Sequence, residues 1–230
     1  MKVGILQSSY IPWKGYFDVV GSVDLFIFYD DVQFTNRDWR NRNWIKGKDG
    51  LLMLTVPCGS NRNRLICDVN LIDNKWQKKH WMAIAHNYAK APFFNRYKYF
   101  FEDFYLNNIW KNLSEMNQFL IRKISKEILG FDVHFEDSRK FALVGRKGRR
   151  IIELLCKIKA TEYFSGPSAK NYLDPADFME NKIKLSWMDY SDYSEYRQLF
   201  PPFEHKVSII DLIFNEGPNA IRFLKSGRQT

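Results

Sequence analysis

Few cysteines and no long hydrophobic run are present in this chain of 230 residues. The cysteines are Cys58, Cys67 and Cys156, an odd number whose spacing fits neither a CxxC pair nor a Cys/His zinc site. We therefore expect reduced thiols, without a disulfide framework or a metal site. No stretch of about eighteen apolar residues occurs, and no charged segment followed by a long apolar one begins the chain. We expect a cytoplasmic protein that does not associate with a membrane.

The motifs that mark the commonest enzyme classes are also missing. The sequence contains no recognisable Walker P-loop, GxGxxG fingerprint, HExxH motif, GxSxG elbow or acetyl-CoA loop. A lysine-rich tail, a zinc knuckle and an RNA-binding signature are absent as well. The net charge of +9 nevertheless favours an anionic partner, and we place a phosphorylated metabolite ahead of nucleic acid.

Apolar and aromatic side chains are abundant, and they follow an alternating pattern of strands and helices. Apolar residues make up 45% of the chain and aromatic residues 17%, enough for one domain, 1–230, with a helical section at about 74–130. The predicted strands are 2–7, 24–30, 51–56, 66–72, 131–136, 162–165 and 184–188, of which 51–56 and 66–72 are expected to pair. The predicted helices are 16–20, 76–89, 95–109, 113–129, 148–159, 175–181, 207–214 and 218–224. A strand, helix, strand order at the beginning predicts an α/β fold with a parallel sheet.

The first candidate ligand site is the segment QSSYIPWKGYF at 7–17, a turn between a strand and a helix. Open α/β sheets bind ligands at the carboxyl ends of their strands, and a helix N-terminus favours phosphate. The candidate binding residues are Gln7, Tyr10, Trp13, Gly15 and Tyr16. The alternative is an ordinary Pro/Gly turn packed by aromatic rings.

The second candidate is YDDVQFTNRDWRNRNWI at 29–45. Asp30 and Asp31 follow a strand, where they can accept hydrogen bonds from a sugar or an amine, or hold Mg²⁺ with phosphate. Arginine and asparagine side chains alternate with tryptophans that can stack on a base or a sugar ring. The candidate binding residues are Gln33, Asn36, Arg37, Trp39, Arg40, Asn41, Arg42 and Asn43. A solvated loop would carry similar residues.

Three further segments supply single candidates. His80 and His86 lie about 240° apart on one helix, so they are not expected to share a metal. Either one alone can act as a general base, with His80 as the candidate, and the alternative is a packed or surface histidine. In YFSGPSAKNYLD at 163–174, Ser165, Lys170 and Tyr172 follow a strand and return to the same edge of a parallel sheet. Ser208 either caps the last long helix or binds a ligand. We expect Asp30, Arg40 and Lys170 to share one cavity.

Several of these segments together resemble the WbqC-like protein family. The resemblance rests on QSSYIPWKGYF, FIFYDDVQFTNRDWRNRNWI, LTVP, KHW, KAPFF, YFSGPSAKNYLD and SIIDLIFNEG, which follow the family pattern in order over nearly the whole chain. Ser8 departs from it, since the family usually has Gln-Pro there. A shorter stretch, IPWKGYFDVVGSVDLFIFYDDVQF, is similar to the opening of pantothenate synthetase and its nucleotidyltransferase relatives. This similarity implies a Rossmann-like sheet of the nucleotidyltransferase-like fold, although both motif histidines are missing, with Trp13 and Tyr16 near their places.

The family resemblance implies a role in bacterial surface-polysaccharide synthesis. The leading hypothesis is an enzyme that transfers an acyl or aminoacyl group, such as glycyl, to the amine of a nucleotide-linked amino-deoxy sugar. The cofactor stays open, with ATP as one candidate, and an aminoacyl-tRNA is the one nucleic acid considered as a donor. The alternatives are a nucleotidyl- or glycosyltransferase and a non-catalytic module that binds nucleotide sugar or nucleic acid. A homodimer is also compatible with the sequence.

Overall fold

Five parallel strands form the central sheet of the computed structural model, which describes residues 1–228. They are β1 (Lys2–Leu6), β2 (Leu25–Phe28), β5 (His134–Asp137), β6 (Glu162–Ser165) and β7 (Lys184–Trp187). Their order across the sheet is β5-β2-β1-β6-β7, with every neighbouring pair parallel. The chain proceeds from β1 through β2 to β5 and then continues on the other side of β1. This order confirms the predicted α/β fold with a Rossmann-like sheet.

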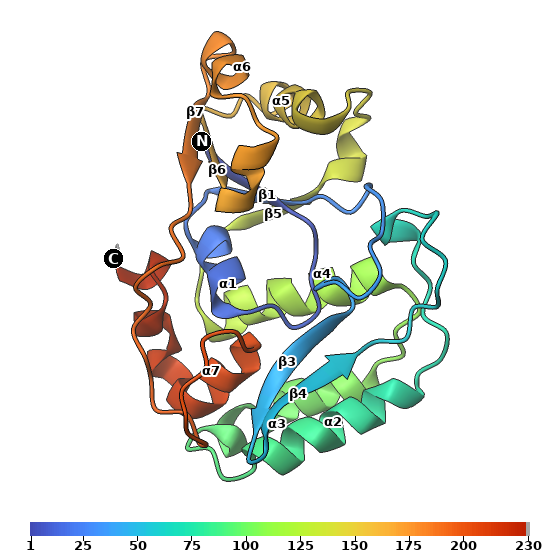
Figure 1. Cartoon of the computed structure of the whole chain (residues 1–230), viewed down its shortest axis with the longest axis vertical. Helices are drawn as coiled ribbons and strands as arrows, with labels where there is room; N and C mark the ends of the chain where they lie inside the picture. The colour runs from blue at the N-terminus through green and yellow to red at the C-terminus, as the bar shows by residue number, and fades with distance from the viewer. Residues whose placement is uncertain (229–230) are drawn as a thin grey trace.

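One apolar face of the sheet is covered by two helices from the second half of the chain. Val3, Ile5 and Ile27 belong to one core cluster with side chains of α5 (Lys147–Lys157) and α6 (Pro175–Glu180). Figure 1 shows these helices above the sheet. Alternate side chains of a strand point to opposite faces of the sheet. The intervening residues of these strands therefore pack into a second core on the opposite face.

The opposite face packs against α1 (Lys14–Gly21) and α4 (Leu113–Lys123), which lie below the sheet in Figure 1. Phe26 and Phe28 supply the aromatic surface there and are fully buried. Gly4 lets α1 approach closely, since a Cβ atom at this position would come within 3.2 Å of a helix side chain. The whole chain between β2 and β5 forms one long crossover connection, and α4 is the last α-helix in it.

A two-stranded hairpin lies apart from the sheet and corrects one prediction. It pairs β3 (Arg42–Gly47) with β4 (Gly50–Thr55) in antiparallel register. The predicted strand 66–72, expected to pair with the strand before it, instead contains the 3-10 turn Ile66–Asp68 and an isolated bridge from Asn70 to Asn112. An Asp-Gly pair at the hairpin turn, with Gly50 at φ +110°, favours pairing with the preceding segment instead.

The helical section confirms the three helices predicted after the hairpin. It contains α2 (Lys75–Tyr88), α3 (Phe94–Glu102) and α4, and both α3 and α4 continue into a π-helical turn, at Asp103–Asn107 and Ile124–Ile128. The predicted helix 207–214 corresponds to α7 (Ile209–Glu216), after residues 188–208, which have no regular helix or strand. Further 3-10 turns occupy Ser138–Phe141, Pro167–Asn171, Gly217–Phe223 and Ser226–Arg228.

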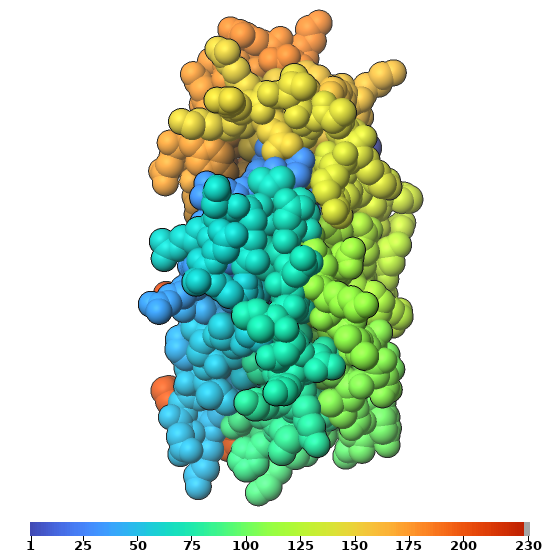
Figure 2. Space-filling model, turned by 90° about the vertical axis from the view of Figure 1, so that its right-hand side faces the viewer, coloured from blue at the N-terminus to red at the C-terminus, as the bar shows by residue number. Residues whose placement is uncertain are grey.

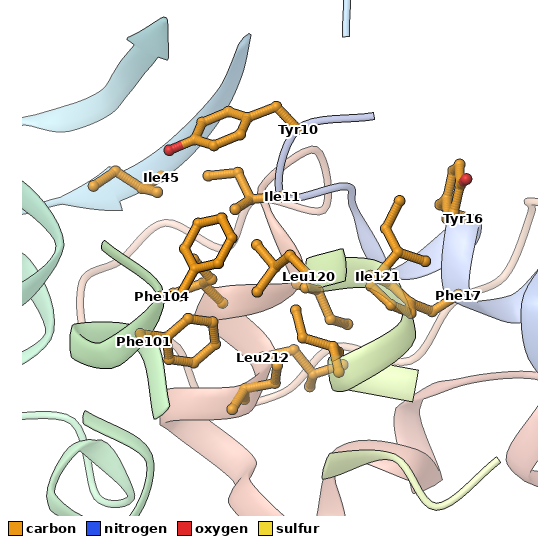
Figure 3. Packing of buried hydrophobic residues seen from close by; sticks show 14 of the residues in the cluster. Tyr10, Ile11, Tyr16, Phe17, Ile45, Phe101, Phe104, Leu120, Ile121 and Leu212 are labelled. Carbon is orange, nitrogen blue, oxygen red and sulfur yellow. The ribbon is translucent and has the colours of Figure 1, made fainter. Parts of the chain in front are cut away.

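The larger core lies where α1, α4, α7 and the hairpin meet. Figure 3 shows Phe17, Ile45, Phe104, Leu120 and Leu212 converging from these elements and from the turn after α3. None of these side chains is more than 2% exposed. Burial of each such side chain contributes about 1.5–3 kcal/mol relative to exposure. The packing among these five side chains therefore holds the helical section against the sheet.

The segment between β4 and α2 forms part of one face of the molecule. In Figure 2 it appears in cyan, below the segment that leads into α5, in yellow. Backbone hydrogen bonds from Phe34 to the Arg64 carbonyl (2.9 Å) and from Cys67 to the Asp30 carbonyl (3.0 Å) join it to the loop after β2. The polar loop 29–41 is therefore held from both sides. No helix among residues 1–228 has the length and apolar character needed to span a bilayer.

Candidate functional site

A cavity of about 1230 Å³ opens at the carboxyl ends of β1, β2 and β6. Its lining includes Gln7, Tyr29 and Ser165, which end or directly follow these strands. The strand order reverses between β1 and β6, and ligands of open α/β sheets bind in the crevice at such a switch point. We call this space the rim cavity.

A second cavity of about 790 Å³ adjoins the rim cavity, and half of its lining residues carry aromatic rings. We call it the aromatic cavity. Its lining consists of Ser9, Pro12, Trp13, Tyr16, Trp39, Arg40, Asn43, Tyr190, Asp192, Tyr193, His205 and Lys206. The residues shared with the rim cavity are Trp13, Tyr16, Trp39, Arg40 and Tyr190. The two cavities adjoin at these residues, and we call the two together the cleft.

Arg40 stands at the junction of the two cavities. Its Nη1 donates to the side-chain oxygen of Gln7, and its carbonyl accepts from Asn117 Nδ2 at 2.8 Å. Its Nε is buried and makes no hydrogen bond within the described part of the chain. The guanidinium is thus fixed at the end of β1, where Arg40 lines both cavities.

Tyr16 contributes a neutral phenol to the same junction. Its hydroxyl donates to the Gln7 carbonyl at 3.2 Å. Burial, reinforced by Asp30, raises the pKa of Tyr16 well above its usual value, and the opposing effect of Arg40 is smaller. The phenol therefore stays protonated near neutral pH and acts as a hydrogen-bond donor and acceptor.

The outer wall of the rim cavity is basic. Arg40, Arg146, Lys147 and Arg150 line it, against a single carboxylate, Asp31. Asp31 is itself engaged, because its Oδ2 pairs with Arg150 and its Oδ1 accepts from a serine hydroxyl at 2.5 Å. Basic side chains that outnumber acidic ones around a partly enclosed space create a positive potential, which favours phosphate groups.

The loop that leads through Arg146 to Lys147, the first residue of α5, is fixed by a carboxylate of the same helix. Glu153 accepts hydrogen bonds from the backbone N–H groups of Val144 (3.1 Å) and Gly145 (2.8 Å). These bonds lower the pKa of Glu153 and keep it charged. The basic loop thereby has a defined position at the edge of the cleft.

Asp30, a predicted catalytic residue, lies behind the cleft rather than in its lining. It is fully buried and accepts hydrogen bonds from the Ser8 backbone (2.7 Å), Ser114 Oγ (2.5 Å) and Gln118 Nε2 (3.2 Å). The same Gln118 group donates to Asp137 at 2.8 Å. Asp30 therefore holds the turn after β1 against α4 and does not reach a ligand in the cleft.

His80, the predicted general base, is also placed outside the cleft. It is 7% exposed, and its Nδ1 lies 2.7 Å from the hydroxyl of Tyr10, which in turn lies 2.6 Å from the Tyr105 hydroxyl. Burial lowers the pKa of His80 to about 4, although a hydrogen bond with the Thr55 backbone acts in the opposite direction. The ring is a neutral bridge between α2 and the turn after β1.

The other sequence candidates divide into two groups. Those in the lining of the cleft are Gln7, Trp13, Tyr16, Asp31, Gln33, Trp39, Arg40, Asn43, Ser165 and Tyr172. Those outside it are Tyr10, Gly15, Asp30, Asn36, Arg37, His80, Asn41, Arg42, Lys170 and Ser208. The expectation that Asp30, Arg40 and Lys170 share a cavity is therefore wrong, since only Arg40 contributes to the lining.

Local contacts explain several of these placements. Asn36 and Asn41 donate to the backbone carbonyls of Ser60 (3.0 Å) and Val56 (2.9 Å). Ser208 caps α7 through the Ile210 N–H at 3.2 Å. Arg37 is exposed and has a left-handed backbone, at φ +56°. The ammonium of Lys170 lies 5.5 Å above the Trp187 ring, while Gly15 packs against the ring of Trp13.

Sequence reasoning missed the part of the cleft that comes from 188–208 and from the segment leading into α5. Tyr190, Tyr193 and His205 belong to the first segment, and Arg146 and Lys147 to the second. Neither segment has a periodic apolar pattern, so nothing local indicated that it would return to the strand ends. The density of tyrosine and aspartate in 189–196 was the one available signal.

Comparisons with known proteins place these features in a family context. The model of the WbqC-like protein family matches residues 7–223, a range that includes every residue named above as lining the two cavities. A Mycobacterium tuberculosis protein, named Uncharacterized protein Rv1507c, is 43% identical over 230 residues, which cover 99% of this chain and 99% of that protein. No solved structure matches the chain.

Proposed function

The chain belongs to the WbqC-like protein family, and from this membership and the form of the cleft we propose a biosynthetic enzyme acting on a nucleotide-linked amino-deoxy sugar. The proposed reaction is the transfer of an acyl or aminoacyl group, such as glycyl, to the sugar amine during surface-polysaccharide synthesis. The observation that carries the proposal is the two-part cleft, with a basic half at the strand switch point and an aromatic half beside it.

The two halves fit the parts of a nucleotide sugar. Arg40, Arg146, Lys147 and Arg150 present donors for a diphosphate in the rim cavity. Tyr172, in the same cavity, offers a ring on which the nucleobase can stack. The diphosphate then directs the sugar past the junction and into the aromatic cavity. Aromatic faces there suit the apolar face of a pyranose.

The size of the cleft leaves room for a second reactant. Pockets for small ligands usually measure about 300–1,000 Å³. The two cavities measure about 1230 and 790 Å³. A nucleotide sugar and an acyl donor therefore fit together, as a transfer between two bound substrates requires.

The proposed step forms one bond and breaks one. The lone pair of the neutral sugar amine attacks the acyl carbon of an activated donor, an ester or an acyl phosphate, and the new C–N bond gives a tetrahedral intermediate. The bond between the acyl carbon and the leaving oxygen then breaks, and that oxygen takes its electron pair. The proton lost from nitrogen goes to the leaving oxygen or to water. Either ATP or an aminoacyl-tRNA can supply the activation.

Product detection tests the reaction directly. The purified chain is incubated with UDP- and dTDP-linked amino sugars, with glycine and ATP or with glycyl-tRNA, and products are identified by mass spectrometry. A mass increase equal to the acyl group supports the proposal. Complete absence of product, together with no binding of any nucleoside diphosphate, would overturn it.

A matched pair of variants tests the diphosphate site. Arg40→Gln removes the charge at the junction, whereas Arg37→Gln changes an exposed arginine of the same loop outside the lining. Binding of UDP, measured by calorimetry, should weaken about tenfold or more in the first variant and stay unchanged in the second. Equal effects in both variants would argue against a localised site.

Other transfers to or from a nucleotide sugar use the same kind of cleft. Nucleotidyl transfer would release pyrophosphate and glycosyl transfer would release free nucleotide, so the released product discriminates both from acyl transfer. Among residues 1–228 no group of three or more His, Cys, Asp or Glu side chains is placed to hold a metal ion. A non-catalytic nucleic-acid module would instead bind oligonucleotides in a strongly salt-dependent manner.

A further inference from the structure

One histidine of the aromatic cavity has no part in the reaction described so far. His205 belongs to the irregular segment 188–208 and lines the cavity together with Trp13, Tyr193 and Lys206. Its ring is partly buried and meets the Phe203 ring edge to face, with centroids 4.6 Å apart. The ring is therefore held in place beside the space where the proposed sugar amine would lie.

The neighbouring lysine determines which ring nitrogen carries the hydrogen. Lys14, at the beginning of α1, is 3% exposed, and its Nζ lies 3.2 Å from Nδ1 of His205. The rings of Tyr193 and Tyr196 lie 4.7 and 5.4 Å from Nζ, which stabilises the charged ammonium. An ammonium group only donates hydrogen bonds. With Lys14 as an ammonium, Nδ1 of His205 accepts the hydrogen bond, and the hydrogen of the neutral ring then resides on Nε2.

The charge state of the ring agrees with this arrangement. Burial and the nearby Lys14 charge lower the pKa of His205 below its usual value, against the smaller effects of Glu195 and Glu204. The ring is therefore mainly neutral near neutral pH. A neutral ring with its hydrogen on Nε2 can donate one hydrogen bond to the cavity, but it has no free nitrogen with which to accept a proton.

We propose that His205 donates a hydrogen bond from Nε2 to the acyl carbonyl oxygen in the aromatic cavity, and does not act as the general base. This inference rests on the proposed acyl transfer. As the amine attacks, the carbonyl π electrons move onto the oxygen, and the Nε2–H group stabilises the negative charge that develops there. When the leaving oxygen departs, these electrons reform the C=O bond and His205 is unchanged. Lys14 is a positioning residue, because it acts through the ring.

The tautomer can be measured without any substrate. In the ¹⁵N-labelled protein, long-range ¹H–¹⁵N NMR spectra distinguish a protonated ring nitrogen from an unprotonated one. The chain has 4 histidines, and the signals of His205 are identified by their loss in His205→Gln. We expect protonated Nε2 and unprotonated Nδ1 near neutral pH. Protonation at Nδ1, or at both nitrogens, would overturn the proposal whether or not acyl transfer is observed.

Variants separate a donor from a base when transfer activity is present. A glutamine side chain places an N–H donor near the position of Nε2 but cannot accept a proton, whereas alanine does neither. We expect His205→Ala to lower kcat by about 100-fold or more, the usual effect of removing one oxyanion donor, and His205→Gln to retain most of the rate. Equal losses in the two variants would favour a base and contradict the proposal.

Two controls complete the design. His86→Gln alters an exposed histidine of α2, far from the lining, and should leave the rate unchanged. Lys14→Met should raise the pKa of His205 in the NMR titration, and Lys14→Arg should retain the low value if the methionine variant does not fold. A wild-type protein without transfer activity but with the Nε2–H tautomer would refute the proposed function, and with it the acyl oxygen as the acceptor, while the tautomer of His205 itself would stand.

Discussion

The buried His80 makes a quantitative prediction about acid stability. Its folded-state pKa of about 4 lies below the usual value of 6.5, so the folded protein resists protonation of this ring more than the unfolded chain does. A depressed histidine pKa contributes stability that is fully present above about pH 6.5 and is lost as the pH falls toward 4. Between about pH 7.5 and 4.5 the loss from His80 amounts to about 2.5 kcal/mol.

The variant His80→Gln isolates this contribution because glutamine does not titrate. Near pH 7.5 the variant should be less stable than the wild type by about 1–3 kcal/mol, since the buried Tyr10 hydroxyl loses one of its two partners and keeps only Tyr105. Near pH 4.5 the wild type has already lost its advantage. The difference in the free energy of unfolding between the two proteins should therefore shrink by about 2.5 kcal/mol, or change sign.

Urea unfolding followed by circular dichroism at both pH values measures this difference. The exposed His86, changed to glutamine, provides the matched control and should show no comparable pH dependence. If the wild type and His80→Gln differ by the same amount at both pH values, within about 0.5 kcal/mol, the assignment of His80 as a buried neutral ring is refuted.

Three other changes test the core, the buried carboxylate and the nucleoside position. Leu120→Ala, at the centre of the core in Figure 3, should lower the free energy of unfolding by about 3 kcal/mol in urea titrations, and a loss below about 1 kcal/mol would contradict tight packing there. Ser114→Ala removes a 2.5 Å hydrogen bond to Asp30 and should cost about 2 kcal/mol in the same assay, whereas an unchanged midpoint would mean that Asp30 does not need this donor. Tyr172→Ala should weaken UDP binding about tenfold in calorimetry while the melting temperature stays close to that of the wild type, and unchanged affinity would remove Tyr172 from the nucleoside site.

Local patterns were sufficient for most elements of the fold. The apolar runs at 2–7 and 24–30 became β1 and β2, and the segment at 162–165 became β6 with the predicted bounds. Buried parallel strands are short apolar runs, and amphipathic helices repeat every 3.6 residues, so both can be read within a window of about ten residues. The predicted strand at 66–72 failed because its backbone hydrogen bonds go to the loop after β2 and to the start of α4 rather than to β4, which pairs with β3.

Which polar side chains are buried could not be predicted from the sequence. Asp30 and Asp31 are adjacent and chemically identical, yet Asp30 is fully buried behind the cleft, and Asp31 lies in its lining. Which carboxylate faces a ligand depends on α4, whose Ser114 and Gln118 donate to Asp30 from more than eighty residues away along the chain. In the same way, the sequence does not distinguish His80 from a catalytic histidine, because its contact with Tyr10 exists only in the folded protein.

Local periodicity and the chemistry of neighbouring residues were enough to specify the α/β class, the parallel sheet and the polar turns at the ends of its strands. The composition of the cleft depends instead on tertiary contacts. Its aromatic half needs α1, the loop after β2 and the irregular segment 188–208 to meet, which brings Trp13, Trp39 and Tyr193 together. Such contacts are fixed by packing between elements distant in the chain, and no local pattern records them.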